Sequence, residues 1–169
     1  MSTPSPSDGI RAQLGEMLPQ LRRFARVITR NVQDADDLVQ VAVEKALTRA
    51  EQWRPGSRLD SWMFGIMKNA WIDEIRARRR RERVYAPEEA GADVGDDSAE
   101  SRDILLSVQS AMERLPDEQR IALALVLVAG YSYKDSAELL GIPIGTLTSR
   151  LARGRESLQA MLGSGEATR

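Results

Sequence analysis

Apolar residues recur every three or four positions along most of the chain, the spacing that places them on one face of an α-helix. Three such series lie in the N-terminal half, separated by short polar segments with Asn, Pro or Gly. They predict three amphipathic helices between residues 10 and 82. The apolar positions are Ile10, Leu14, Leu18, Leu21, Ala25 and Ile28; then Leu38, Val39, Ala42, Ala46 and Leu47; then Met63, Ile66, Met67, Ala70, Trp71 and Ile75.

Polar residues and proline predict the helix boundaries. Pro19 either kinks the first helix or lies in the first turn of a second piece. Asp34 is the predicted N-cap of the second helix, which runs to about Glu51. A Pro-Gly loop follows, and Asp60 or Ser61 is predicted to cap the third helix.

Four shorter helices are predicted in the C-terminal third. The segment Ile121–Val128 is nearly continuous in apolar residues and could pass for a strand. We predict a buried helix there because acidic and amide residues precede it and Gly130 follows it. The fold class is therefore all-α: helical domains at 10–83 and 103–162, joined by a linker at 84–102. The linker is rich in acids, Gly and Pro, and is predicted to be flexible.

The last two helices have the pattern of a helix-turn-helix. Ser132 and Asp135 resemble a capping box, and Gly141 ends the short helix that they open. The longer helix that follows turns Leu147 and Leu151 inward. Its outward residues are small, hydroxylic or basic, which suits a helix in a DNA major groove, although a plain helical hairpin is the alternative. These outward residues are Thr148, Ser149, Ala152, Arg153 and Glu156.

The third N-terminal helix has a second candidate constellation. Trp62 and Asn69 are seven residues apart, close to two helical turns, and an arginine run follows them. A stacking ring, a base-reading amide and guanidinium groups are the ingredients of single-strand recognition. The alternatives are that Trp62 belongs to the core and that the arginines are a solvated helix end; Trp71 is predicted to be core.

Charge and composition narrow the function. Net charge is −1, but residues 76–83 hold six Arg and one Glu, whereas residues 87–103 hold seven acids and one Arg. Segregated charge indicates different electrostatic partners for neighbouring segments. The chain has no Cys and no His, so thiol, imidazole and nucleophile–His chemistry are excluded. A hydrolase that uses carboxylates alone is the remaining enzymatic alternative, but the acids lie among bases on helical faces without the signature of a site. We expect no catalytic residues, no metal and no cofactor. Without a long apolar run or a signal peptide, a cytoplasmic protein with no membrane contact is expected.

Three stretches of sequence together resemble the extracytoplasmic-function (ECF) class of RNA polymerase sigma factors. They are DADDLVQVAVEKAL, RLDSWMFGIMKNAWIDEIRARRRR and ERLPDEQRIALALVLVAGYSYKDSAELLGIPIGTLTSRLARGRESL, in that order, and the resemblance spans roughly residues 12–162. It implies a non-enzymatic protein made of sigma regions 2 and 4, with core RNA polymerase, promoter DNA and an anti-sigma factor as partners. Region 2 would melt and read the −10 element and region 4 would read the −35 element.

The resemblance also assigns residues. Asp37, Leu38 and Gln40 would bind the β′ clamp helices of the polymerase, and the segment 123–128 would pack near the β flap. The residues at the −10 DNA would be Arg58, Trp62, Asn69, Arg76, Arg79 and Arg80. Those at the −35 DNA would be Thr148, Ser149, Arg150 and Arg153.

This chain departs from the family pattern at three positions. Val41 stands where an acid is common, and Thr148 and Ala152 stand where larger or basic residues are common. The family's usual −35 base sequence is therefore not expected. A sigma-like decoy that sequesters an anti-sigma factor without binding DNA is the alternative function. A helix-turn-helix repressor is a third possibility, but no segment is evident for dimerisation.

Overall fold

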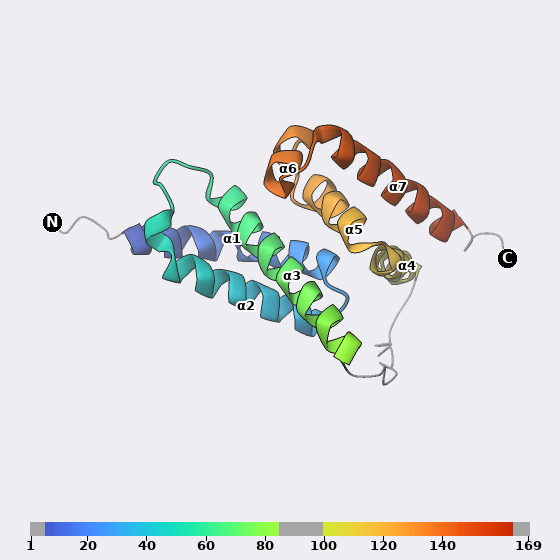
Figure 1. The fold of residues 1–169 in the computed structure, drawn as a ribbon, viewed down its shortest axis with the longest axis horizontal. Coiled ribbons are helices and arrows are strands. Elements are labelled where there is room, and N and C mark those ends of the chain that lie inside the picture. The colour runs from blue at the N-terminus through green and yellow to red at the C-terminus, as the bar shows by residue number, and fades with distance from the viewer. Residues whose placement is uncertain (1–5, 85–99, 164–169) are drawn as a thin grey trace.

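The structure is a computed structural model that describes residues 6–84 and 100–163, and every regular element within these ranges is helical. The all-α prediction is confirmed, and the structure shows two helical domains that lie side by side (Figure 1). The first contains α1 (Pro6–Ile28), α2 (Val32–Thr48), the short 3₁₀ helix η1 (Ala50–Gln52) and α3 (Leu59–Val84). The second contains α4 (Glu100–Arg114), α5 (Asp117–Leu123), the π-helical segment η2 (Ala124–Val128), α6 (Tyr133–Leu140) and α7 (Ile144–Gly163).

The N-terminal helices begin at positions that differ from two predictions. Asn31, not Asp34, caps α2: its side chain accepts a hydrogen bond from the Asp34 backbone N–H at 2.7 Å. Helix α3 already begins at Leu59, so Asp60 lies in its first turn and accepts from the Ser61 N–H. Pro19 lies inside a single continuous α1.

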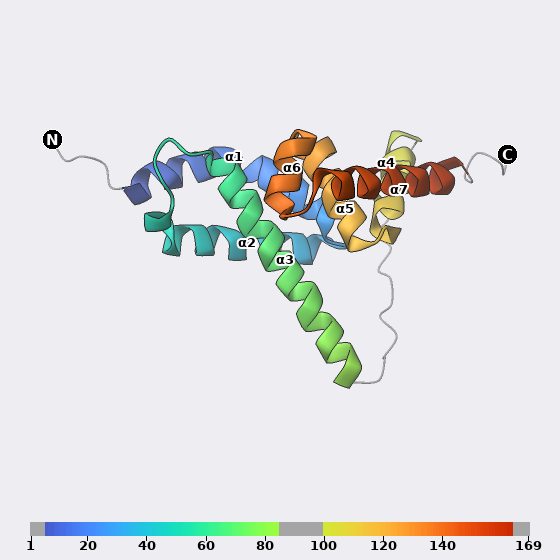
Figure 2. The same cartoon turned by 45° about the horizontal axis from the view of Figure 1, so that its top comes forward.

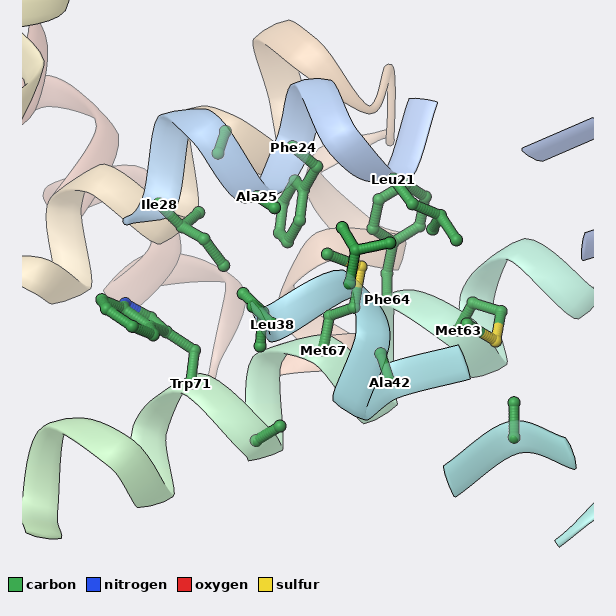
Figure 3. Close-up of a cluster of buried hydrophobic side chains, with 14 of the residues drawn as sticks. Leu21, Phe24, Ala25, Ile28, Leu38, Ala42, Met63, Phe64, Met67 and Trp71 are labelled. Carbon is green, nitrogen blue, oxygen red and sulfur yellow. The ribbon is translucent and has the colours of Figure 1, made fainter. Parts of the chain in front are cut away.

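The N-terminal core is formed where α1, α2 and α3 cross (Figure 3). Phe24 of α1 and Phe64 of α3 meet edge to face, with ring centroids 4.8 Å apart, and both are fully buried. Trp71 is 4% exposed, which confirms its predicted place in the core. The C-terminal part of α3 extends past this core and projects away from the other helices, carrying the arginine run (Figure 2).

The C-terminal domain contains the predicted helix-turn-helix. The Ser132 side chain accepts from the Asp135 N–H, which caps α6. Gly141 then ends α6 in the left-handed conformation at φ 64°, where a side chain would be strained. The segment Ile121–Val128 is helical as predicted. Its second half is a π-turn, in which the Ala129 N–H donates to the carbonyl of Ala124, five residues earlier.

The two domains share a buried apolar seam. Ile121, Leu125 and Tyr131 of the C-terminal domain belong to the same cluster of buried side chains as the N-terminal core. Each such side chain contributes about 1.5–3 kcal/mol when it leaves water. Arg120 is fully buried beside them, and its Nε donates to the carbonyl of Ile28 at the end of α1 at 3.0 Å. The predicted flexible linker falls mainly on residues 85–99, which lie outside the described ranges.

Candidate nucleic-acid interface

One face of α3 aligns the residues predicted to bind single-stranded DNA. Trp62, Asn69 and Arg76 follow one another at intervals of seven residues, and Arg80 lies one turn beyond Arg76, so all four share a face. Trp62 is half-buried: it packs against the core and also lines a cleft of about 540 Å³. Asn69 is exposed at the same cleft. The core and surface interpretations of Trp62 therefore both describe part of its environment.

The loop before α3 contributes Arg58 to the lining of the cleft. Gly56 takes a positive φ of 89°, and the Ser57 hydroxyl donates to the carbonyl of Arg54, which together form a tight turn. Arg58 follows this turn and binds the Asp60 carboxylate at 2.8 Å. Hydrogen bonds from Arg58 and the Ser61 N–H lower the pKa of Asp60, although its partial burial acts in the opposite direction.

The arginine run divides into residues with different partners. Arg78 donates to both carboxylate oxygens of Asp34 at 2.7 and 2.8 Å and to Glu74 at 2.8 Å, and it lies over the Trp71 ring. These bonds lower the pKa of both carboxyl groups against the effect of burial and raise that of Arg78. Arg78 therefore joins α3 to α2.

The other arginines of the run are more available. Arg81 also pairs with Glu74, and Arg79 reaches Asp117 of α5 at 3.4 Å. Arg76 and Arg80 are exposed, and neither forms an ion pair with the residues that the structure describes. The family resemblance assigned Arg76, Arg79 and Arg80 to −10 DNA. Among the described residues, Arg76 and Arg80 have no ion-pair partner, and Arg79 is paired with Asp117 of the second domain.

Helix α7 presents the residues predicted to enter a major groove. Leu147 and Leu151 are buried, whereas Thr148, Ser149 and Arg153 are exposed. Arg150 is half-buried and pairs with Glu118 at 3.1 Å. The predicted division of α7 into an inner and an outer face is confirmed, and Arg150 is the only one of the four candidates with an ion-pair partner among the described residues.

Gly154 lies inside α7 for a reason that the sequence pattern could not show. A Cβ atom at this position would lie 2.7 Å from Cδ1 of Leu123, which is fully buried on α5. The absence of a side chain lets α5 and α7 approach closely. This close contact explains why Gly occupies position 154, although Gly inside a helix is about 1 kcal/mol less favourable than Ala.

The residues predicted to bind the polymerase lie in three environments. Leu38 is buried in the core and Asp37 is exposed beside it, and both line a cleft of about 230 Å³ between α2 and α3. Gln40 is exposed at a different depression and donates to Glu44. In the segment 123–128, Leu123 at the end of α5 and Leu125 of η2 are buried, whereas Leu127 of η2 is 60% exposed. Asp37, Gln40 and Leu127 are therefore the accessible members of these sets.

The described residues form neither a membrane span nor a cluster of metal ligands. No helix in the described part of the chain is long and apolar enough to cross a membrane. Among the same residues, no group of three or more acidic side chains is arranged to hold a metal ion.

Comparison with known proteins identifies the two halves of the chain. The family model of Sigma-70 region 2 matches residues 14–81, and that of Sigma-70 region 4 matches residues 105–158. Over 157 residues the chain is 34% identical to the ECF RNA polymerase sigma factor EcfG of Rhodopseudomonas palustris, covering 92% of this chain and 86% of that protein. The chain is an ECF sigma factor. The predicted family is confirmed, and it is a family of transcription factors rather than enzymes.

Further relatives agree with this assignment. The chain is 40% identical over 144 residues to the ECF sigma factor SigM of Mycobacterium tuberculosis, covering 85% of this chain and 72% of SigM. It resembles the solved structure of the sigma factor RpoE in complex with the anti-sigma factor NepR from Bartonella quintana. That match has a TM-score of 0.75, 31% identity and coverage of 90% and 96% of the two chains. CnrH, solved with a domain of CnrY, shares the fold at 23% identity and a TM-score of 0.69.

The structure adds residues to region 2's cleft that sequence reasoning missed. Arg49, Gly65 and Ile66 line it together with Trp62 and Asn69. Asp135 and Glu138 of α6 also line it, although they belong to region 4. Helical spacing from Trp62 could have found Gly65 and Ile66. No local signal could have found the two acids, because they follow Trp62 by more than 70 residues.

Proposed function

We propose that this sigma factor reads melted −10 DNA with the aligned face of α3 and −35 duplex DNA with the exposed face of α7. The observation that carries the proposal is the line of Trp62, Asn69, Arg76 and Arg80 along one face of α3, with a cleft beside its first two members. A ring and an amide at a cleft suit an unstacked base, and the free guanidinium groups further along suit backbone phosphates.

The two binding surfaces would act together in the holoenzyme. We propose that residues 10–83 and 103–162 are the two DNA-reading domains and that 84–102 joins them. Each surface alone is small, and polymerase that holds both at a fixed separation makes the second contact intramolecular. Capture of extruded bases at the α3 cleft would offset the free energy of opening the duplex, a few kcal/mol per base. In this role the protein directs polymerase without any chemistry of its own.

We assign polymerase contacts to the exposed side of α2, with Asp37 and Gln40 outward and Leu38 supporting them from the core, and to the exposed part of η2. Because core polymerase is cytoplasmic, the protein would act in the cytoplasm. The RpoE relative was solved with an anti-sigma factor, and we propose that this chain also has one. No feature of the structure favours a decoy that binds only an anti-sigma factor.

Transcription reconstituted with core polymerase tests the assignment. Promoters are first selected with the wild-type holoenzyme from a randomised DNA library. Asn69→Ala should then impair promoter opening while leaving core binding intact, and a pre-melted −10 bubble should not restore discrimination among −10 sequences. Gln109→Ala removes an exposed amide from α4 and serves as the matched control. Opening by the Asn69→Ala holoenzyme at the wild-type rate would contradict the proposal.

The same assay tests α7. Arg153→Ala should lose about 1–3 kcal/mol of discrimination between the best and a mutated −35 sequence if the guanidinium binds a base edge. Arg155→Ala is the control, because Arg155 is exposed on another side of α7 and bonds Tyr133 instead. Equal loss in both variants would reduce Arg153 to a general phosphate contact.

A further inference from the structure

The outer face of α7 contains an apolar row that contributes to neither domain core. Ile144, the first residue of α7, is 53% exposed and belongs to neither of the two apolar clusters among the described residues. Ile142, two residues earlier, does pack against the core of region 4. Thr148 and Ala152 follow Ile144 at intervals of four residues, and both are exposed. Residues at this spacing lie on the same side of a helix, so the three side chains form one row.

The hydroxyl of Thr148 is bonded within the helix. Its Oγ1 donates to the carbonyl of Ile144 at 2.9 Å, one turn earlier. Because a hydroxyl has a single proton, this bond leaves the oxygen able to accept a hydrogen bond but not to donate one. Thr148 therefore offers a methyl group beside an acceptor. With the side chains of Ile144 and Ala152, it gives the row a surface made mainly of methyl groups.

A second row on the same face of α7 is polar. Ser149 and Arg153 are exposed, lie four residues apart and follow directly after the members of the apolar row in the sequence. The face assigned to the −35 duplex is thus divided along its length into a row for hydrogen bonds and a row for apolar contacts. Since larger or basic residues are common in the family at positions 148 and 152, the apolar row is a feature of this chain.

The major groove of DNA offers one apolar group to such a row. Thymine presents its C5-methyl there, whereas the other bases present donors and acceptors of hydrogen bonds. In a helix-turn-helix, the N-terminal residues of the second helix contact the base edges, and Ile144 begins α7. An isoleucine against a polar base edge takes that edge out of water without giving it a partner, which is unfavourable. Against a thymine methyl, two apolar surfaces leave water together.

We propose that Ile144 and Thr148 are specificity-determining residues that recognise the methyl groups of thymines in the −35 duplex. This inference rests on the proposed function of α7 and adds which bases its apolar row selects. Residues four apart are separated by about 6 Å along a helix, which corresponds to about two base-pair steps of DNA. The −35 element read by this chain should therefore contain thymines within about two base pairs of each other, on either strand. Ser149 and Arg153 remain available for hydrogen bonds to adjoining bases.

Replacing thymine by deoxyuridine tests the proposal with the wild-type protein. Deoxyuridine lacks the C5-methyl and keeps every donor and acceptor of thymine. In a promoter selected from the randomised library, each thymine of the −35 element is replaced singly, on either strand. At a contacted thymine, the affinity of the wild-type holoenzyme for the promoter should fall about three- to fivefold, the factor expected when one buried methyl group is lost. This factor should be the same at low and high salt, because a methyl contact releases no counterions.

Substitutions then assign each methyl group to its partner in the protein. Ile144→Ala should abolish the preference for thymine over deoxyuridine at one position. Thr148→Ser removes the side-chain methyl and keeps the hydroxyl, so it should abolish the preference at the other. Thr148→Val keeps a methyl and removes the hydroxyl, and it should retain that preference. Val108→Ala is the control, because Val108 is a 38% exposed apolar residue of α4, outside the helix-turn-helix, and both preferences should persist.

5-Methylcytosine separates recognition of the methyl group from recognition of hydrogen-bonding groups. Replacing a contacted T·A pair by C·G removes the methyl and changes the donors and acceptors, so binding should weaken more than with deoxyuridine. Methylating that cytosine at C5 restores only the methyl, and affinity should recover about three- to fivefold. A C·G pair that gains nothing from methylation at every such position would contradict the proposal.

Three further results would overturn it: a selected −35 element without thymine, deoxyuridine bound as well as thymine by the wild type, or a thymine preference that survives Thr148→Ser and is lost in Thr148→Val. The last result would make the Thr148 oxygen, not its methyl, the reading group. Failure of the −35 assignment is recognised separately, since Arg153→Ala would then discriminate among −35 sequences as the wild type does. If Arg153→Ala loses discrimination but deoxyuridine has no effect, only the thymine proposal is wrong.

Discussion

At the scale of single residues, partners decide what chemically identical side chains do. The run of residues 76–83 contains six arginines, yet Arg78 alone is held by two carboxylates and an aromatic ring. Its bidentate bond to Asp34 is the contact that joins the projecting part of α3 to the start of α2. Such a bond is specific in geometry and stronger than an ordinary surface pair.

The Asp34–Arg78 pair predicts how stability responds to pH. Because Arg78 lowers the pKa of Asp34 in the folded state, the pair stabilises the protein fully above the unfolded pKa of about 4. The stabilisation is lost as pH falls through the lower folded value. Asp34→Asn should therefore reduce the free energy of unfolding by about 1 kcal/mol at pH 7 and by progressively less below about pH 4.

Thermal melts of the wild type and Asp34→Asn at a series of pH values check this expectation. Asp36→Asn is the control, because Asp36 is an exposed acid on the same helix with no ion pair in the described structure. If Asp34→Asn destabilises the protein as much at pH 3 as at pH 7, the charge of the Asp34 carboxylate does not contribute to the free energy of unfolding.

At the scale of elements, the helix-turn-helix depends on close approach as well as on caps. Ser132 begins α6 by accepting from the Asp135 N–H with its side chain, and Gly141 ends α6 by donating its own N–H to carbonyls of the last turn. Sequence patterns predict both of these local bonds well. The crossing of α5 and α7 depends instead on the space at Gly154, which Leu123 fills from the other helix. This contact determines how closely α5 and α7 approach each other.

Gly154→Ala should therefore destabilise the protein by about 1 kcal/mol. The substitution gains about 1 kcal/mol of helix propensity, but it forces Leu123 to move within a packed core, which typically costs 1–3 kcal/mol. Gly15→Ala is the matched control: Gly15 is exposed inside α1 with no atom within 4 Å of the added Cβ, so it should stabilise by up to about 1 kcal/mol. Denaturant unfolding measures the change in the free energy of unfolding for each variant. Equal stabilisation by the two substitutions would show that α5 and α7 can move apart at little cost.

At the scale of the whole molecule, one buried cation links the two domains. Arg120 is fully buried and donates to the carbonyls of Leu115 and Ile28, and it also pairs with Asp117. Burial lowers its pKa, as expected for a cation taken out of water. A group of this kind stabilises the fold only as long as every partner stays in place.

Arg120→Ala should lower the free energy of unfolding by about 3 kcal/mol or more, because it removes the guanidinium donor of the Ile28 and Leu115 carbonyls and one partner of Asp117. Since the bond to Ile28 crosses between domains, calorimetry should also show one transition in the wild type and two in the variant. Arg114→Ala, at an exposed position on α4, should change stability by less than about 0.5 kcal/mol. A single transition at the wild-type temperature in Arg120→Ala would contradict the assigned link.

The sequence by itself determined the helices, their order and the family. Amphipathic spacing predicted most of the α-helices, and the polar residues before Ile121 with Gly130 after Val128 predicted the helix between them. The capping residue Ser132 and the terminating Gly141 were also predicted correctly, because these signals act between residues close together in the sequence. The errors were also local: Asn31 competed with Asp34 as a cap, and α3 began at Leu59. The predicted cap of α2 lay three residues too late, because several polar residues in this segment can cap a helix.

Only the tertiary structure decided which charged groups are free and which surface is covered. Arg78 finds its partner 44 residues away and Arg120 finds one 92 residues away. Helical periodicity contains no information at such separations, because it reports only which face of each helix is apolar. The same limit explains why the acids of α6 could not be placed at the cleft of α3. Their position follows from the packing of Tyr131 and its apolar neighbours against region 2, and that packing is a property of two helix faces brought together in space.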